Sequence, residues 1–441
     1  MCVAYMQWYD YVTSIFYNNI DAPLYNIYVM LDFADAITCE AFHKLFASFV
    51  QQNPELSTYL AMVDGKLQWV PSPKNETPCE NVSSYCTYVQ CSTNMFEEKT
   101  SEVVNNPLTT FCKWHFTLLN DKDANTSRLI WSLSHAYCDG YKCIDMLLKG
   151  FTTKKDYVPP TAKTKITNLF ENAYYLVIGT IVLLLIHLKL FMNAIYKGII
   201  NVFTCNPPAP KHTKSVLIHC DPFCLNDVKA LSKQYGVTVN DFLIGVVTKA
   251  FHYYHKKLNM DATVNSPDIF MPFNLNDGPS LQTDYIPNNL CFPYLQKFDA
   301  SHNTSLMENI HKWTNMYKHS AFLPMFVQFM KGLYYIYPKC GIDFIHNIDK
   351  MYFNTLVHFT NILTPNMADI KSDICPDIVS VRVGISPFKH TISIVSTSFN
   401  GDVRFTVSCN KGVITHTKLF RSCVAKAYRK LAQTGALVSP V

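Results

Sequence analysis

Charged residues are scarce in this chain: they make up 16% of its 441 residues, whereas hydrophobic residues make up 49%. A soluble protein usually has about a quarter of its residues charged, and a disordered chain has few apolar residues. The composition therefore excludes a disordered protein and predicts a large core or contact with a membrane. The formal net charge of +5 is carried mainly by lysines without a long basic run, so no nucleic-acid partner is expected.

Motifs for metal binding are also missing. The sixteen cysteines include no Cys-x-x-Cys, and no pair of histidines has zinc-finger spacing, so no metal site is expected. We interpret most cysteines as reduced, small buried side chains. The N-terminus has no charged segment ahead of an apolar core, so no cleaved signal peptide is expected. No internal repeat is present.

The first part of the chain alternates strand and helix patterns. Residues 24–33 are aromatic and β-branched and predict a strand, whereas residues 38–50 have apolar side chains at helical spacing. Residues 129–134 predict a second strand, and helical spacing begins again at Tyr141. Between them lies the stretch SHAYCDG, residues 134–140, which we therefore place at a strand-to-helix turn.

A long apolar stretch separates this part from the rest of the chain. Residues 172–203 contain a core of about 19 apolar residues, close to the thickness of a bilayer as a helix. His187 and Lys189 interrupt its far end. They favour a shallow re-entrant hairpin or a helix in the membrane plane; one ordinary span is the alternative. Residues 206–210 (NPPAP) predict a stiff linker, and residues 322–338 a second apolar helix that faces lipid or a tunnel mouth.

The second half opens with a predicted strand at residues 215–220 and a buried helix at 238–255. Residues 391–399 and 402–409 flank Asn400-Gly401, which predicts a hairpin with a type I′ turn.

The histidine in SHAYCDG has a placement that suits catalysis. His135 ends a predicted strand, next to Asp139 as a helix N-cap and Gly140 in a tight turn. An imidazole with an ordinary pKa near ~6.5 can accept a proton from an alcohol at neutral pH. A lone histidine of this kind is also often a core residue beside a helix cap. Three further stretches each have a structural interpretation on their own: Asn240-Asp241 as a helix cap, and residues 359–365 and 398–401 as turns.

Together and in this order, these stretches resemble the wax ester synthase / diacylglycerol acyltransferase family of the His-dependent, CoA-linked acyltransferase superfamily. The family motif HHxxxDG is similar to residues 134–140, and its T-x-N-D helix start to residues 238–241. Further family motifs are similar to residues 271–274, 360–365 and 398–401, and residues 53–56 and 65–69 also fit. The resemblance covers most of the chain outside residues 172–203.

Two positions depart from the family pattern. Ser134 stands where the first histidine of the pair is expected, and an arginine that often follows Pro-x-Asn is missing, with Asn276 and Asp277 nearby. The second histidine is the one that the family uses as base, which corresponds to His135. The missing arginine leaves the partner of Asp139 open.

The resemblance implies an α/β (α+β) fold: two chloramphenicol-acetyltransferase-like mixed-sheet domains with an active-site tunnel between them, plus a membrane-inserted helical segment. We expect an N-terminal half over residues 1–165, a membrane-associated segment and linker over 166–210, and a C-terminal half over 211–441. A single span would separate the halves, which is a second reason to expect in-plane or re-entrant insertion.

The resemblance also implies a reaction. His135 is expected to be the general base, with Asn240 donating to the oxyanion, and with Asp139, Gly140 and Asp241 as structural support. Cys138 is not expected to act as a nucleophile. The expected substrates are acyl-CoA, as co-substrate without a permanently bound cofactor, and a long-chain alcohol or diacylglycerol. Membrane lipid is an expected partner, at the endoplasmic reticulum or a lipid-droplet surface.

Two other functions stay open. One is a related acyltransferase that acts on a smaller alcohol or an amine. The other is a membrane-tethered lipid-binding protein that keeps the fold without turnover.

Overall fold

The structure is a computed structural model that describes residues 26–63, 66–151, 215–259, 267, 269–274, 290–291, 294–295, 298–319, 357–364, 376–387 and 392–435. The predicted apolar stretches 172–203 and 322–338 and the linker 206–210 lie outside these residues. In the described part, no helix combines the length and the apolar character needed to cross a membrane.

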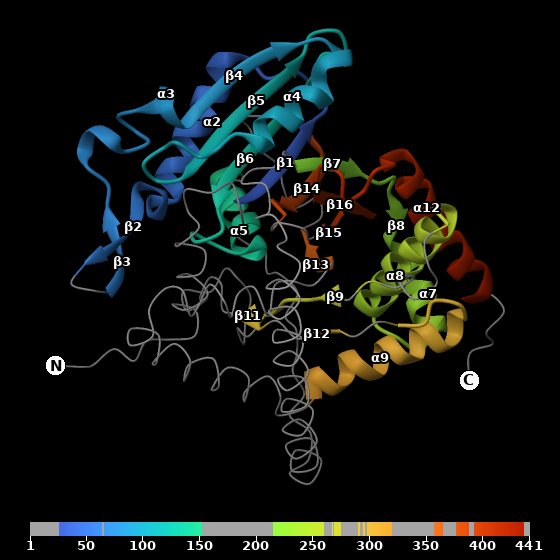
Figure 1. Cartoon of the computed structure of the whole chain (residues 1–441). Helices are drawn as coiled ribbons and strands as arrows, with labels where there is room; N and C mark the ends of the chain where they lie inside the picture. The colour runs from blue at the N-terminus through green and yellow to red at the C-terminus, as the bar shows by residue number, and fades with distance from the viewer. Residues whose placement is uncertain are drawn as a thin grey trace, which may run out of the picture.

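Two β-sheets organise the molecule, and Figure 1 shows them meeting along its middle. The elements of the first half are β1 (Asn26–Phe33), α2 (Cys39–Gln52), a 3-10 turn (Pro54–Ser57), β2 (Thr58–Val63), β3 (Lys66–Pro71), a 3-10 turn (Lys74–Glu76), α3 (Val82–Tyr85), β4 (Cys86–Cys91), α4 (Thr93–Asn105), β5 (Trp114–Asp121), β6 (Thr126–Ser134) and α5 (Gly140–Phe151).

The elements of the second half follow in chain order. They are β7 (Ser215–His219), β8 (Phe223–Cys224), α7 (Leu225–Gln234), α8 (Val239–Lys257), β9 (Ile269–Phe270), β10 (Phe273–Asn274), β11 (Leu290–Cys291), β12 (Tyr294–Leu295), α9 (Asn303–His319), β13 (Val357–Leu363), β14 (Ile378–Ile385), β15 (Ile392–Phe399), β16 (Asp402–Asn410) and α12 (Thr417–Gly435).

The first sheet has the strand order β14-β1-β6-β5-β4. Strand β1 is buried on both faces because its side chains alternate between two clusters. Ile27, Val29 and Leu31 pack with the residues of α2 and α5, whereas Tyr28 and Met30 pack on the side of α4. A strand covered on both faces reads as a continuous apolar run, as residues 27–31 of β1 do.

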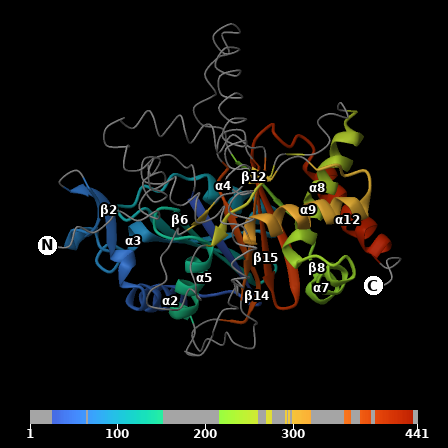
Figure 2. The same ribbon diagram turned by 90° about the horizontal axis from the view of Figure 1, so that it is seen from below.

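The second sheet contains β12-β9-β13-β15-β16-β7, with β8 also paired to β16. Helices α7, α8, α9 and α12 lie together at its outer side, and Figure 2 shows the same arrangement from below. Helix α8 is buried along most of its length, as its sequence predicts. Its N-terminus carries a capping box in which the Thr238 side chain and the Asp241 side chain each bond the other residue's backbone.

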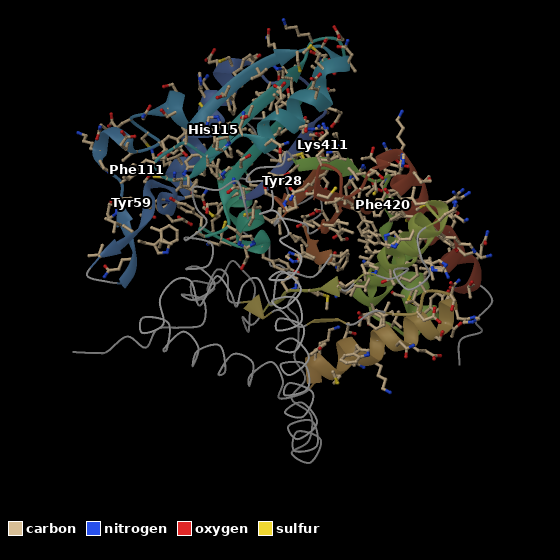
Figure 3. The ribbon with its side chains drawn as sticks, viewed as in Figure 1. Tyr28, Tyr59, Phe111, His115, Lys411 and Phe420 are labelled. Carbon is tan, nitrogen blue, oxygen red and sulfur yellow. The ribbon has the colours of Figure 1, made fainter. Side chains whose placement is uncertain are left out.

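The two sheets are joined by strand exchange and by direct contact. Strand β14 lies late in the sequence but pairs antiparallel with β1 of the first sheet. The hydroxyl of Tyr28 forms a hydrogen bond with Ser408 on β16, and Figure 3 shows Tyr28 where the two sheets approach. The Asn105 side chain bonds the backbone N–H and carbonyl of Ser215 at the start of β7.

Most local predictions are confirmed. The predicted strands at 24–33 (of which 26–33 are described), 129–134 and 215–220 and the helices at 38–50, from 141, and at 238–255 all form, and the described ends differ by at most a few residues. Asn400 and Gly401 have φ of 50° and 80° between β15 and β16, as a type I′ turn requires. The prediction of a turn at residues 359–365 is wrong, because Phe359–Leu363 belong to strand β13.

Candidate active site

The SHAYCDG stretch forms the predicted strand-to-helix turn. Strand β6 ends at Ser134, whose carbonyl accepts a hydrogen bond from the Tyr137 backbone N–H at 3.1 Å. The Ser134 hydroxyl accepts a bond of 3.4 Å from the Ala136 backbone N–H, a local side-chain turn that serine commonly makes. Serine at the position of the family's first histidine therefore supports the backbone that holds His135.

Asp139 caps the helix that follows. One of its carboxylate oxygens accepts a hydrogen bond from the Lys142 backbone N–H at 3.0 Å, and its carbonyl accepts one from the Cys143 N–H at 2.9 Å. The side chain is buried, so this capping fixes the first turn of α5 against the end of β6. Asn276 and Asp277, near the place where the family arginine is expected, lie outside the described residues.

Gly140 lets the motif turn approach the second sheet. A Cβ atom at this position would stand 2.3 Å from Cδ1 of Ile362 on β13, which is far inside van der Waals contact. The next residue continues the contact, since the Tyr141 hydroxyl donates to the Asn361 carbonyl at 3.3 Å. The motif turn, residues 134–140, thus packs directly against β13, a strand of the second half.

Strand β13 brings two more of the predicted stretches to this place. It runs parallel to β15, with Asn361 opposite Ser396 and Leu363 opposite Ser398. The Thr364 N–H donates to the Ser398 carbonyl at 3.1 Å just beyond the end of the strand. Residues 134–140, 359–364 and 398–401 are therefore neighbours, although more than 200 positions separate the first from the second.

Asn240 and Met271 lie near the edge of β13 that pairs with β9, opposite the edge that pairs with β15. Strand β9 pairs parallel with β13, and Met271 follows it directly. The half-buried Asn240, in the first turn of α8, donates from its side-chain amide to Sδ of Met271 at 3.0 Å. A thioether is a weak acceptor, so a stronger acceptor placed nearby can take over this N–H at little cost.

Asp241, the neighbour of Asn240, is fully buried and holds α8 to α9. Its carboxylate accepts hydrogen bonds from Nδ1 of His311 at 2.7 Å and from the Thr314 hydroxyl at 2.7 Å. Burial raises the pKa of this carboxyl, but the hydrogen bonds from His311 and Thr314 outweigh burial and leave the pKa below its ordinary value. Asp241 is therefore a charged anchor for the helix start that presents Asn240.

His135 is buried in a turn whose neighbouring residues pack in two different hydrophobic cores. It is 7% exposed. The next residue, Ala136, packs in the core of the second half, whereas Cys138 packs in the core of the first half. The backbone on the C-terminal side of His135 is therefore packed against both halves. An imidazole in such a place is shielded from bulk water and can exchange a proton with a substrate hydroxyl that reaches it.

The sequence did not predict the role of Tyr137 in fixing this turn. Its hydroxyl donates to the Thr58 carbonyl at 2.6 Å, and its ring lies 4.7 Å from that of Trp69. Burial raises the pKa of Tyr137 well above its ordinary value, so it stays a hydrogen-bond donor. Tyr137 thereby ties the motif turn to the β2–β3 hairpin, whose Trp69 is exposed. An aromatic at a variable motif position was the only sequence signal.

No group of three His, Cys, Asp or Glu side chains that could hold a metal ion occurs among the described residues. The cysteines whose side chains are described are all free, and eight of these eleven are buried. This agrees with their interpretation as small buried side chains.

The comparisons with known proteins bear on the fold. Neither a protein-family model nor a curated protein sequence matches the chain. Solved structures do. The wax ester synthase/diacylglycerol acyltransferase from Marinobacter aquaeolei VT8 is 12% identical, with a TM-score of 0.58 over 96% of this chain and 98% of that one.

Two further structures are similar to the same extent. The TRI3 trichothecene 15-O-acetyltransferase from Fusarium sporotrichioides has a TM-score of 0.61 at 12% identity, over 96% of this chain and 94% of that one. The first condensation domain of the CDA synthetase has a TM-score of 0.57 at 11% identity, over 98% and 95%. The chain therefore has the two-sheet α/β fold of these acyltransferases and condensation domains.

Proposed function

We propose that this protein is an acyl-CoA-dependent O-acyltransferase. It transfers a long-chain acyl group to a fatty alcohol, making a wax ester, and to diacylglycerol as a second acceptor. The observation that carries the proposal is the contact of the turn that holds His135 with strand β13, made through Gly140 and Tyr141, in a fold that solved acyltransferases share.

In the proposed reaction His135 accepts the hydroxyl proton of the acceptor while the hydroxyl oxygen attacks the thioester carbonyl carbon. The carbonyl oxygen becomes negative, and the Asn240 amide, released from Met271, donates a hydrogen bond to it. The intermediate then collapses, the carbon–sulfur bond breaks, and His135 returns the proton to the leaving thiolate of CoA. No covalent acyl-enzyme is required.

Incubation with labelled palmitoyl-CoA and either hexadecanol or diacylglycerol tests this function. We expect label in a wax ester with hexadecanol and a smaller amount in triacylglycerol. Label in neither product, with intact palmitoyl-CoA and a folded protein, would contradict the proposal.

The trichothecene acetyltransferase among the similar structures supports a second candidate, transfer to a smaller alcohol. Acyl transfer to a short alcohol or an amine, without activity on hexadecanol, would favour it. A silent lipid-binding protein, which the loss of the paired histidine and the arginine keeps open, would bind palmitoyl-CoA and give no product with any acceptor.

Residues 172–203 fit a membrane-bound enzyme in this proposal. An in-plane or re-entrant segment would keep both halves on one side of the endoplasmic reticulum membrane or of a lipid droplet, next to their apolar substrates.

The oxyanion role of Asn240 makes a separate prediction. Asn240→Ala should lower kcat by about 10²-fold and leave the KM for acyl-CoA nearly unchanged, because the hydrogen bond forms only in the transition state. Steady-state kinetics with palmitoyl-CoA and hexadecanol measure both parameters. Asn240→Asp, which keeps the shape without the donor, should lose as much activity. An unchanged kcat in the Ala variant would assign the residue to packing against Met271.

A further inference from the structure

Two cysteine sulfurs are in contact beside the candidate base. Sγ of Cys138 lies 3.2 Å from Sγ of Cys143, and neither residue is exposed. Both are free thiols, and both pack in the hydrophobic core of the first half. Cys138 is the residue before Asp139 in the motif turn, and Cys143 lies in the first turn of α5.

The helix cap explains why these two side chains meet. With Asp139 as N-cap, Cys138 occupies the position before the cap and Cys143 the fourth position of the helix. In many helices an apolar pair at these two positions packs together and fixes the angle at which the chain enters the helix. Here both members of the pair are cysteine. The packing contact therefore brings two thiol sulfurs to within 3.2 Å of each other.

We infer that Cys138 and Cys143 form a redox modification site, which a peroxide converts to a disulfide across the first turn of α5. One thiol loses its proton, and the thiolate attacks hydrogen peroxide to give a sulfenic acid and a hydroxide, which takes up that proton and becomes water. The other sulfur attacks the sulfenic sulfur, forms the S–S bond and releases a second water. Two thiols lose two electrons, and one peroxide is reduced to two waters. A dithiol reductant reverses the step by thiol–disulfide exchange.

The modification would act on the motif turn. A disulfide has an S–S distance of about 2.05 Å, so the sulfurs must approach by about 1.2 Å from their contact of 3.2 Å. The resulting ring includes Asp139, which caps α5, and Gly140, which packs against β13. Displacement of a catalytic group by about 1 Å can cost around 10²-fold in rate. On the proposed function, the disulfide should therefore suppress transfer by displacing His135.

Peptide mapping tests the site itself. Trypsin cleaves after Lys142, so Cys138 lies in peptide 129–142 and Cys143 in peptide 143–149. After hours of treatment of the folded chain with hydrogen peroxide, alkylation and digestion, we expect the two peptides joined. Burial raises the pKa of Cys143 well above its ordinary value, so the reaction is slow. Cys143→Ala should give no linked peptide, whereas Cys409→Ala, a buried cysteine of the second core, should give it as the wild type does.

Two results would overturn the inference. One is full alkylation of both residues after peroxide treatment; the other is oxidation of Cys138 to a sulfinic or sulfonic acid with Cys143 still reduced. The peptide readout is decisive whether or not the chain transfers acyl groups, so its failure is distinct from failure of the proposed function.

Activity tests the consequence of the disulfide. Peroxide should lower wild-type transfer by about tenfold or more, dithiothreitol should restore it, and Cys143→Ala should resist the loss. A linked peptide with unchanged turnover would show that the disulfide does not control the motif turn.

Discussion

Replacement of His135 by glutamine or alanine is expected to lower kcat for acyl transfer by at least about 10²-fold, and by up to about 10⁴-fold. The imidazole is the proposed acceptor of the hydroxyl proton, and neither replacement can accept that proton. The KM for acyl-CoA should change little, because this interaction develops on the way to the transition state. Steady-state kinetics with palmitoyl-CoA and hexadecanol would measure the loss.

Controls must separate loss of the base from loss of structure. His135 is buried, so alanine leaves a cavity, whereas glutamine fills most of the volume and keeps hydrogen-bonding groups. Both variants should unfold cooperatively at temperatures near that of the wild type. His43 on α2 is exposed, and His43→Ala should retain full activity. A folded His135→Gln variant with more than about a tenth of wild-type kcat would contradict general base catalysis by this residue.

Local features of the fold could be predicted from the sequence because their causes are local. Asn400-Gly401 adopts positive φ because a two-residue hairpin turn demands it. The helix cap expected at Asn240-Asp241 also forms, although its N-cap is Thr238, which makes a capping box with Asp241. Asp139 at the start of α5 is of the same kind. Each of these signals depends on neighbours in the chain, so no knowledge of the tertiary structure is needed to read it.

Strand β13 is a feature of the fold that could not be predicted from the sequence. Its residues looked like a turn, yet β9 and β15 on either side pair with it in parallel. Parallel pairing takes its stability from partners far away in sequence, so it leaves little local pattern. The pairing of β14 with β1 is antiparallel, but it is hidden as well because about 350 positions of sequence separate Asp32 from Arg382. For the candidate site, the sequence indicated His135 and its turn. The close packing of Gly140 against Ile362 could not be predicted, because the two residues are far apart in sequence.

Asp32 is an acidic residue in the otherwise largely apolar strand β1, and the sequence pattern does not explain why it is there. It accepts a hydrogen bond of 2.6 Å from Nε of Arg128 on β6, and another from Arg382 on β14. The chain contains only five arginines. Two of these five bind this one carboxylate. Arg128 and Arg382 have only 5% and 15% of their side chains exposed. The carboxylate is therefore shared by two guanidiniums and helps to hold β14, a strand from the second half of the chain, in the first sheet.

Asp32→Asn is therefore expected to lower the free energy of unfolding by about 3 kcal/mol or more, because it leaves two buried guanidiniums without their shared anion. Urea titration at neutral pH measures the loss. Burial raises the pKa of Asp32, but Arg128 and Arg382 outweigh burial and hold the pKa below its ordinary value. Its contribution is thus full above the unfolded-state pKa of about 3.9 and disappears as the pH falls through the lower folded-state pKa, so the variant and the wild type should converge in acid.

A matched variant tests whether the effect belongs to buried charge. Glu97 also contacts Arg128, at 3.0 Å, but 63% of its side chain is exposed. Exposed ion pairs contribute about 0–1 kcal/mol, so Glu97→Gln should change the unfolding free energy far less than Asp32→Asn. Equal losses in the two variants, or an Asp32→Asn loss that persists unchanged in acid, would contradict this assignment. The pairing of β14, β1 and β6 in the first sheet would then not depend on the charge of Asp32.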